Sequence, residues 1–313
     1  MTDPPITDRT VVPATADGPS ADLDVRVLEH SPAIAPMFAR ALATGFGRPG
    51  AHGVLPTQRL MLTGVQQDVA RVAAYCEVTG SVLSDRLPLT WLHVLTFPLQ
   101  VKLMSGREFP FPMLGMVHVA NTMTQHRPVR VAESLTLSTW VENLAPHRSG
   151  HTVDVVGEAR VGDEVVWEGR STYLVRGQTE EAKGGEAATG QTQAQRHAIP
   201  ENELAIWRLS ADLGRRYAKV SGDANPIHLS ALSAKALGFP RAIAHGMWSH
   251  ARVLAAVEPR LPDSLTVDAQ FLKPILLPST VVLRGGMEKG QGILALTSKD
   301  GSRRHLAMTV AAP

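Results

Sequence analysis

The 313-residue sequence contains one cysteine, Cys76, so it cannot form an internal disulfide and it has no CxxC zinc knuckle. Aromatic residues make up only 5% of the chain, and neither sign of charge dominates, with 31 basic against 29 acidic residues. A formal charge of +2 gives no reason to expect a nucleic-acid partner. The most apolar long window, Leu87–Met104, is interrupted by two prolines, a histidine, a glutamine and a lysine. It therefore predicts a buried helix rather than a membrane span.

Several signatures of nucleotide binding and nucleophilic catalysis are also missing. No GxGxxG opens a βαβ unit and there is no GxxxxGK[ST] loop, so nicotinamide and nucleotide-triphosphate chemistry lack support. No Gly-x-Ser-x-Gly elbow is present. Residues 1–20 lack the basic flank and apolar core of a signal peptide, and their Pro, Thr, Ala and Asp content predicts a disordered arm. Together with the single cysteine, this indicates a cytoplasmic protein.

The clearest boundary in the chain is the segment 177–198. It reads GQTEEAKGGEAATGQTQAQRHA, with no aromatic residue and no aliphatic residue larger than alanine. Such a segment cannot bury enough apolar surface to order itself, so we predict a flexible linker. The linker divides the chain into an N-terminal half, residues 21–176, and a C-terminal half, residues 199–313. Two domains are also what a chain of 313 residues favours.

Both halves follow one plan, in which helices precede a run of antiparallel strands. Helices are expected at Val69–Thr79, Leu92–Met104 and His245–Val257. Short alternating runs predict strands at Val117–Thr122, Ser134–Val141, Thr152–Val161, Glu164–Val175, Ser264–Leu272, Ser279–Gly286, Gly292–Ser298 and Arg303–Val310. Turns are expected at Asn143–Pro146 and Gly162–Asp163. The expected fold class is α+β, with one helix packed on a curled sheet in each half.

A weak internal repeat supports duplication of this unit. The segments Val72–Gly80 and Arg215–Gly222 resemble each other and end on a shared glycine. From that glycine, 12 residues lead to His93 in the first half and 22 lead to His245 in the second. This comparison pairs His93 with His245, and it places an insertion in the second half.

The insertion begins with the turn Gly222–His228, which contains a carboxylate, a carboxamide and an imidazole. Asp223 and His228 together can hold a water molecule and pass its protons, and Asn225 can fix the water or the substrate by hydrogen bonds. The alternative is an ordinary surface turn, in which Asn225 caps a helix that starts at Pro226. The first half has Ser81, Leu83 and Arg86 in the places of these three residues, so the repeat does not require the chemical side chains.

Gly246 lies at the start of the helix that follows. A glycine there leaves backbone N–H groups open toward a ligand, and the helix dipole adds partial positive charge. This is a suitable donor for an oxyanion. The alternative is that a small residue is needed for close packing.

A metal site is not expected. His245 and His250 are five residues apart on a helix, which separates them by about 140° at 3.6 residues per turn, so they do not share a face. No cysteine lies near them and no HExxH pattern is present. Cys76 lies on the apolar stripe of its helix and is expected to be a core residue.

The motif Val220–His228 resembles the (R)-specific enoyl-thioester hydratase motif of the MaoC-like dehydratases. Ala244-His245-Gly246-Met247 and Phe271-Leu272-Lys273-Pro274 continue the resemblance. In the first half, Pro88–Met104 and Phe109–His118 look like the N-terminal half of actinobacterial double-hotdog 3-hydroxyacyl-thioester dehydratases. The resemblance spans most of residues 55–313.

The resemblance implies a double hotdog, with a non-catalytic half at 21–176 and a catalytic half at 199–313. It implies Asp223 and His228 as the catalytic pair, Asn225 as a supporting residue and the Gly246 backbone N–H as the oxyanion donor. The implied reaction is the reversible hydration of a trans-2-enoyl thioester to the (R)-3-hydroxyacyl thioester in fatty-acid metabolism, with no metal or redox cofactor.

The expected partner is an acyl-CoA or an acyl group on a carrier protein, and either a monomer or a homodimer is compatible with the duplicated chain. Two alternatives stay open, a hotdog thioesterase and a non-catalytic subunit that binds acyl thioesters.

Overall fold

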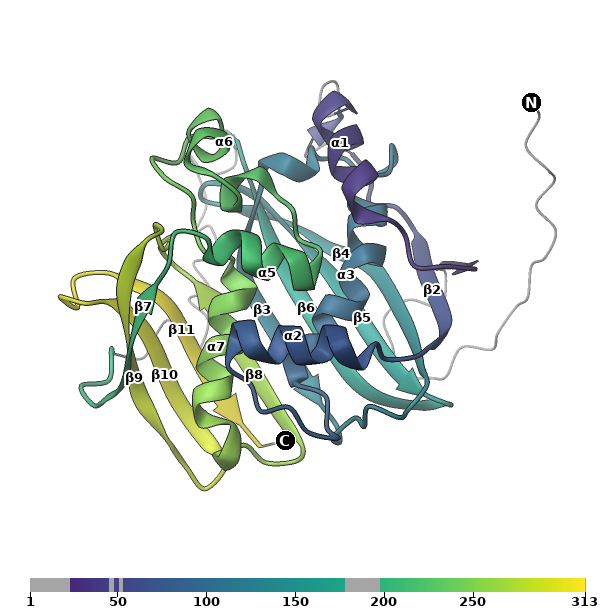
Figure 1. Ribbon diagram of the computed structural model, residues 1–313. Helices are drawn as coiled ribbons and strands as arrows, with labels where there is room; N and C mark the ends of the chain where they lie inside the picture. The colour runs from purple at the N-terminus through teal and green to yellow at the C-terminus, as the bar shows by residue number, and fades with distance from the viewer. Residues whose placement is uncertain (1–22, 45–47, 51–52, 178–197, 313) are drawn as a thin grey trace, which may run out of the picture.

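The computed structural model describes residues 23–44, 48–50, 53–177 and 198–312 (Figure 1). The predicted arm, residues 1–20, lies outside these ranges. So does the predicted linker, 177–198, apart from its first and last residues. Among the described residues, no helix has both the length and the apolar character needed to cross a membrane.

One continuous sheet of eleven strands runs through both halves, in the order β1-β2-β4-β5-β6-β3-β8-β11-β10-β9-β7. The N-terminal half contributes β1 (Asp24–Leu28), β2 (Gln58–Val65), β3 (Met116–Gln125), β4 (Leu135–His147), β5 (Gly150–Val161) and β6 (Glu164–Arg176). The C-terminal half contributes β7 (Glu203–Leu209), β8 (Leu265–Phe271), β9 (Ser279–Glu288), β10 (Gln291–Ser298) and β11 (Arg304–Ala311). The pairings are antiparallel except for β1, which runs parallel to β2.

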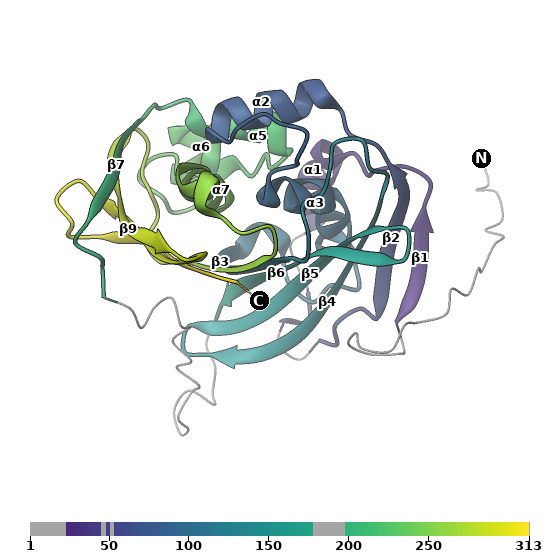
Figure 2. The same ribbon diagram turned by 90° about the horizontal axis from the view of Figure 1, so that it is seen from below.

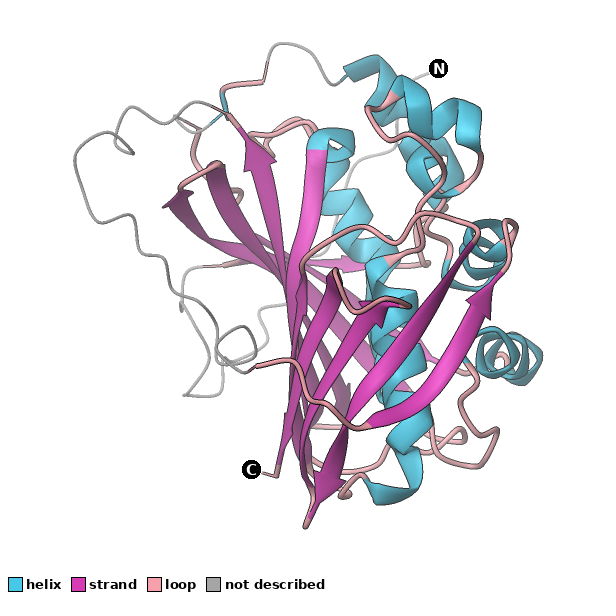
Figure 3. Cartoon of the chain, turned by 90° about the vertical axis from the view of Figure 1, so that its left-hand side faces the viewer, coloured by secondary structure: helices cyan, strands magenta, loops and turns pink. Residues whose placement is uncertain are grey.

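The helices lie on one side of this sheet. They are α1 (Ile34–Thr44), α2 (Val69–Thr79), α3 (Leu89–Ser105), α5 (Leu213–Ser221), α6 (Ala231–Ala236) and α7 (Gly246–Val257), with the short 3-10 helices η2 (Met113–Gly115), η4 (Pro226–His228) and η5 (Glu258–Arg260). The sheet curls around α3 and α7, and α2 and α5 cover these two helices from the side away from the sheet (Figures 2 and 3). This arrangement confirms the α+β class and the double hotdog.

The central helix α3 is buried because its sequence is apolar on every side. Fourteen of its seventeen residues are buried, which a helix with one solvated face does not allow. Pro98 is tolerated inside it. The helix is longer than the expected Leu92–Met104, by three residues at its N-terminal end and by one at its C-terminal end.

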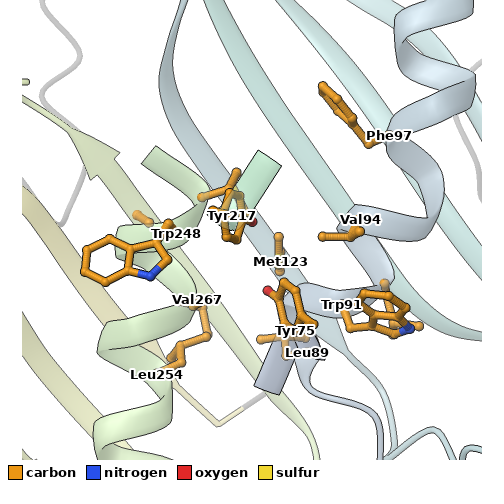
Figure 4. Close-up of a cluster of buried hydrophobic side chains, with 14 of the residues drawn as sticks. Tyr75, Leu89, Trp91, Val94, Phe97, Met123, Tyr217, Trp248, Leu254 and Val267 are labelled. Atoms are coloured by element: carbon orange, nitrogen blue, oxygen red, sulfur yellow. The ribbon is translucent and has the colours of Figure 1, made fainter. Parts of the chain in front are cut away.

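The two halves meet where β3 pairs with β8. Met123 of β3 lies opposite Val267 of β8, and both side chains are fully buried. Beside them the hydroxyl groups of Thr124 and Thr266 are 3.0 Å apart. Figure 4 shows Met123 and Val267 in one cluster with side chains of α2, α3, α5 and α7. The junction is therefore both a strand pair and the centre of the core.

Most of the predicted elements are confirmed, and one prediction is wrong. The bounds of α2 match the expected Val69–Thr79, and each of the eight expected strands is present. The turn expected at Asn143–Pro146 is not there, because β4 continues through it to His147. The β4–β5 register shifts between Glu142 and Ala145, and Asn143 takes a left-handed φ of 55°. A bulge uses the same residue types as a turn. The edge strand β7 was not expected.

Shortening the Met123 side chain tests how far the stability of the fold depends on the junction of β3 and β8. Met123→Ala should lower the free energy of unfolding by about 2–5 kcal/mol, because it leaves a cavity where both halves pack. Urea denaturation followed by circular dichroism measures this. Ile293→Ala on β10 is the matched control, since Ile293 is 38% exposed, and it should cost less than about 1 kcal/mol. Equal losses in the two variants would contradict a core centred on β3 and β8.

Candidate active site

The turn that contains Asp223 begins where α5 ends. Gly222 takes a left-handed φ of 82° and its N–H caps the helix by donating to the Ala218 carbonyl at 2.9 Å. A Cβ at Gly222 would lie 2.7 Å from Cδ1 of Ile34, so α1 of the N-terminal half packs directly on the turn. Glycine is therefore needed both for the backbone angle and for the contact.

Backbone groups of the turn hold the carboxylate of Asp223. The Asn225 N–H donates to Asp223 Oδ1 at 3.1 Å, which is an Asx turn. The side chain is 26% exposed, and burial raises its pKa above the ordinary value for aspartate, partly offset by His228 and by the Asn225 N–H bond. A raised pKa makes this carboxyl group better suited to carry a proton than an exposed aspartate is.

Asn225 caps the 3-10 helix η4, which was one of the two roles that the sequence allowed for it. Its Oδ1 accepts from the Ile227 N–H at 3.4 Å, and Pro226 is the first residue of η4. This cap turns the chain so that His228, two residues after Pro226, lies back beside Asp223. The contribution of Asn225 to substrate binding stays a prediction.

The hydrogen bonds of His228 determine which of its nitrogens carries the proton. Nδ1 lies 2.8 Å from the Ile243 carbonyl oxygen, which can only accept, so Nδ1 carries the hydrogen and Nε2 has a free lone pair. The residue is only 8% exposed, and burial first and the neighbouring His245 second lower its pKa to about 3. At neutral pH the ring is therefore an uncharged base.

Gly214 of α5 fixes the distance between this helix and η4. A Cβ on Gly214 would lie 2.0 Å from the His228 carbonyl oxygen, so no larger residue fits without moving His228.

Gly246 is the first residue of α7, as expected. The first backbone acceptor bond of this helix is from the Ser249 N–H to the His245 carbonyl at 3.2 Å. The N–H groups of Gly246 and the next two residues therefore have no partner within the helix. A Cβ at Gly246 would lie 3.0–3.2 Å from the ring of Phe271. The contact with Phe271 supports the packing explanation, and the role of the Gly246 N–H as an oxyanion donor stays a prediction.

His245 belongs to the site, although the sequence gave it no role there. Its ring stacks on His228 with centroids 3.7 Å apart and an interplanar angle of 25°. Its Nε2 lies 3.0 Å from the Asp223 carbonyl oxygen and 3.8 Å from Oδ2 of the same residue. From the sequence, His245 was considered only together with His250 as a possible metal ligand. In the structure its neighbours are Asp223 and His228 of the preceding turn.

Asp223, His228 and His245 also meet the distance requirement for a metal site, since one ligating atom of each lies within 4.8 Å of the others. The geometry disfavours a shared ion. Imidazole binds a metal through an in-plane lone pair at about 2.0–2.1 Å. Two rings stacked at 25° direct their lone pairs along nearly parallel planes, so they do not converge on one point.

The N-terminal half contributes a second wall to the site. Its His118, on β3, stacks on Tyr173 of β6 with centroids 4.7 Å apart, and its other side meets Phe271 edge-on at 4.9 Å. Burial and then the charge of Asp223 raise the pKa of the Tyr173 phenol above its ordinary value. The sequence predicted β3 and β6, but not that His118 and Tyr173 on them reach Phe271 of the C-terminal half.

The first-half counterparts of the chemical residues lie in ordinary surface positions. Leu83 is 53% exposed, and Arg86 forms an exposed ion pair with Asp263 at 2.6 Å. Ser81 is 3.1 Å from the Thr79 hydroxyl. This segment does not assemble a second carboxylate–imidazole pair.

A second group of buried histidines lies deeper, between the central helices. His93 is the fifth residue of α3 and His250 the fifth residue of α7, and each follows a tryptophan by two positions. Counted from the starts of the two helices, His93 therefore corresponds to His250, whereas counted from their last residues, Ser105 and Val257, it corresponds to His245. The pairing of His93 with His245 stays a prediction.

These two histidines are neutral in the folded protein. Burial lowers the pKa of His93 to about 4, and burial together with His93 lowers the pKa of His250 to about 3. His250 has no exposed surface, and neither ring nitrogen has a hydrogen-bond partner among the described residues.

Comparison with known proteins agrees with the geometry. A family model described as MaoC-like domain matches residues 186–306. The 3-hydroxyacyl-thioester dehydratase X of Mycobacterium tuberculosis is 38% identical over 256 residues, which is 82% of this chain and 90% of that protein. The crystal structure of HtdX from the same organism superposes with a TM-score of 0.70 at 35% identity, covering 82% of this chain and 100% of that one. A MaoC-like dehydratase from Phytophthora capsici shares the fold, with a TM-score of 0.65, 18% identity and coverage of 82% and 95%.

The sheet, the two central helices and the Asp223–His228 turn define a double-hotdog protein of the dehydratase type. The chain belongs to the MaoC-like family of 3-hydroxyacyl-thioester dehydratases, which confirms the resemblance inferred from its motifs.

The buried histidines predict a dependence of stability on pH. In the unfolded chain they bind a proton below about pH 6.5, whereas in the folded protein His93 and His250 stay neutral down to about pH 4 and 3. The free energy of unfolding should therefore fall as the pH drops from 6.5 toward 4, by about 1.4 kcal/mol per pH unit for each such histidine.

His250→Leu should make this slope shallower by about one proton, because it removes one group that only the unfolded state protonates. Urea denaturation at pH 7, 6 and 5 measures both slopes. A variant slope equal to that of the wild type would show that His250 is charged in the folded protein.

Proposed function

We propose that the protein catalyses the reversible hydration of trans-2-enoyl thioesters to (R)-3-hydroxyacyl thioesters in fatty-acid metabolism. The observation that carries the proposal is the meeting of Asp223 and His228 with His245, the residue that directly precedes the first turn of α7. The relationship to 3-hydroxyacyl-thioester dehydratase X supports it.

In the hydration direction, Asp223 and His228 hold a water molecule beside Cβ of the substrate. The water oxygen forms a bond to Cβ while one of its protons passes to the pair, and the C=C electrons move to Cα and the thioester oxygen. The Gly246 N–H stabilises that enolate oxygen, a contribution commonly worth about 3–4 kcal/mol for one donor. A proton from the pair then goes to Cα. Dehydration follows the same steps in reverse.

The acid and base roles belong to the pair as a whole. Burial keeps His228 neutral and raises the pKa of Asp223, so one proton can be shared between Nε2 and the carboxyl group. In a coupled pair of this kind the titration steps describe both groups together.

We infer that the reaction uses no metal or redox cofactor, since proton transfer and one oxyanion donor complete it. The substrate is an acyl thioester, and the proposed carrier is coenzyme A or an acyl carrier protein. One chain supplies both the catalytic turn and the opposite wall with His118 and Tyr173, so a monomer suffices and a homodimer is compatible. We propose a cytoplasmic location, as the composition indicates.

Replacement of the pair tests the proposal. Asp223→Asn and His228→Gln should each lower kcat for hydration of trans-2-enoyl-CoA by about 10²–10⁴-fold, because each removes a proton-transfer group. The rate is followed by loss of the ultraviolet absorbance of the conjugated thioester, and chiral analysis should identify the product as the (R) isomer. His126→Gln is the control and should keep the wild-type rate, because His126 follows the end of β3, its side chain is half-exposed and its ring forms a hydrogen bond with Glu168 at 2.9 Å.

Three outcomes would reject the assignment. Near-normal hydration in both variants excludes the Asp223–His228 pair. Release of free thiol from acyl-CoA at the rate of substrate loss identifies a thioesterase. Binding of enoyl-CoA by the wild-type protein with no turnover identifies a non-catalytic binding subunit.

A further inference from the structure

His245 joins two parts of the site that are far apart in sequence. Its main chain precedes Gly246, and its carbonyl accepts from the Ser249 N–H, so it is fixed to the first turn of α7. Its side chain reaches back 22 positions to Asp223, and only 2% of the residue is exposed. His245 therefore links the Asp223 turn directly to the start of α7.

The hydrogen bonds of this ring define its tautomer. Nε2 lies 3.0 Å from the Asp223 carbonyl, which can only accept, so Nε2 carries the hydrogen. Nδ1 is buried and has no partner among the described residues. A proton on Nδ1 would be a buried charge with nothing to accept it, and burial lowers the pKa of His245 to about 4. The ring is neutral at the pH of the reaction, and it donates through Nε2 to the Asp223 carbonyl oxygen.

The face of the ring has a separate contact. It covers His228 at a centroid distance of 3.7 Å, and the ring also contacts Tyr217, with centroids 4.9 Å apart. The stack thus fixes the plane of the His228 ring, and the Ile243 carbonyl fixes its tautomer. The titratable groups that face His245 are Asp223 and His228 from the turn and Tyr217 from α5.

We propose that His245 is a positioning residue of the hydratase site, whose Nε2–H holds the Asp223 main chain and thereby sets the distance from the Asp223–His228 pair to the oxyanion donor at Gly246. This inference rests on the proposed function. Proton transfer and oxyanion stabilisation must act on atoms two bonds apart in one substrate, so a small displacement of the turn lowers the rate without removing any reacting group.

Replacing His245 with glutamine or with asparagine distinguishes the effect of this hydrogen bond from the effect of side-chain size. The amide nitrogen of glutamine can occupy the place of His245 Nε2, whereas asparagine is one methylene shorter and its amide ends near the position of Nδ1. His245→Gln should keep kcat within a few-fold of the wild type. His245→Asn should lower kcat by about 10–100-fold, the usual effect of losing a partner that orients a catalytic group. KM should be unchanged in both variants.

His245→Phe keeps a flat ring against His228 but removes the donor, so it should behave like His245→Asn. His250→Gln is the matched control for losing a buried histidine of the same helix, and it should leave kcat unchanged. The urea midpoint of each variant is measured beside its kinetics, and rates are compared at a temperature where all are folded.

The outcomes distinguish this inference from the proposed function. Wild-type kcat in His245→Asn overturns the positioning role. A fall in His245→Gln as large as that in His245→Asn also overturns it, because the hydrogen bond is then not what matters. If the wild-type protein is active and Asp223→Asn is not, the hydratase assignment stands in either case. If the wild-type protein shows no hydration, the proposed function fails first.

Discussion

The pairing of β3 with β8 is the constraint on which the rest of the structure depends. It makes one sheet of two halves, so α3 and α7 lie in a common hollow and share one core around Met123 and Val267. The same pairing brings the inward side chains of β3 and β6 opposite the N-terminal end of α7. The site therefore takes its chemical groups from one half and its wall, His118 and Tyr173, from the other.

Within that frame, the local geometry of the site comes from small residues and short bonds. Gly222 allows the left-handed end of α5, and Gly214 allows η4 to approach this helix closely. The Asn225 cap and the Ile243 carbonyl then orient His228. Apolar surroundings shift the two pKa values in opposite directions, upward for Asp223 and downward for His228. Each step has a cause that can be removed by a single substitution.

The sequence predicted the elements well, because alternation and helical spacing are local signals. It also brought Asp223, Asn225 and His228 together, since all three lie in one turn. It did not find His245 as a neighbour of the pair, because that contact spans 22 residues and depends on how the loop folds back. Nor did it find that His118 and Tyr173 of the N-terminal half meet Phe271 of the C-terminal half, because that contact depends on the β3–β8 junction. The expected turn at Asn143–Pro146 was wrong because a bulge and a turn require the same backbone conformations.

If the two halves were identical and separate chains, any replacement would appear on both sides at once. In the fused chain, corresponding positions can vary independently. The same freedom applies at the turns, where Ser81 and Asp223 occupy corresponding places. A fused pair can thus give up the chemical side chains of one half and keep that half as a wall of the remaining site, which a symmetric pair of identical chains cannot do.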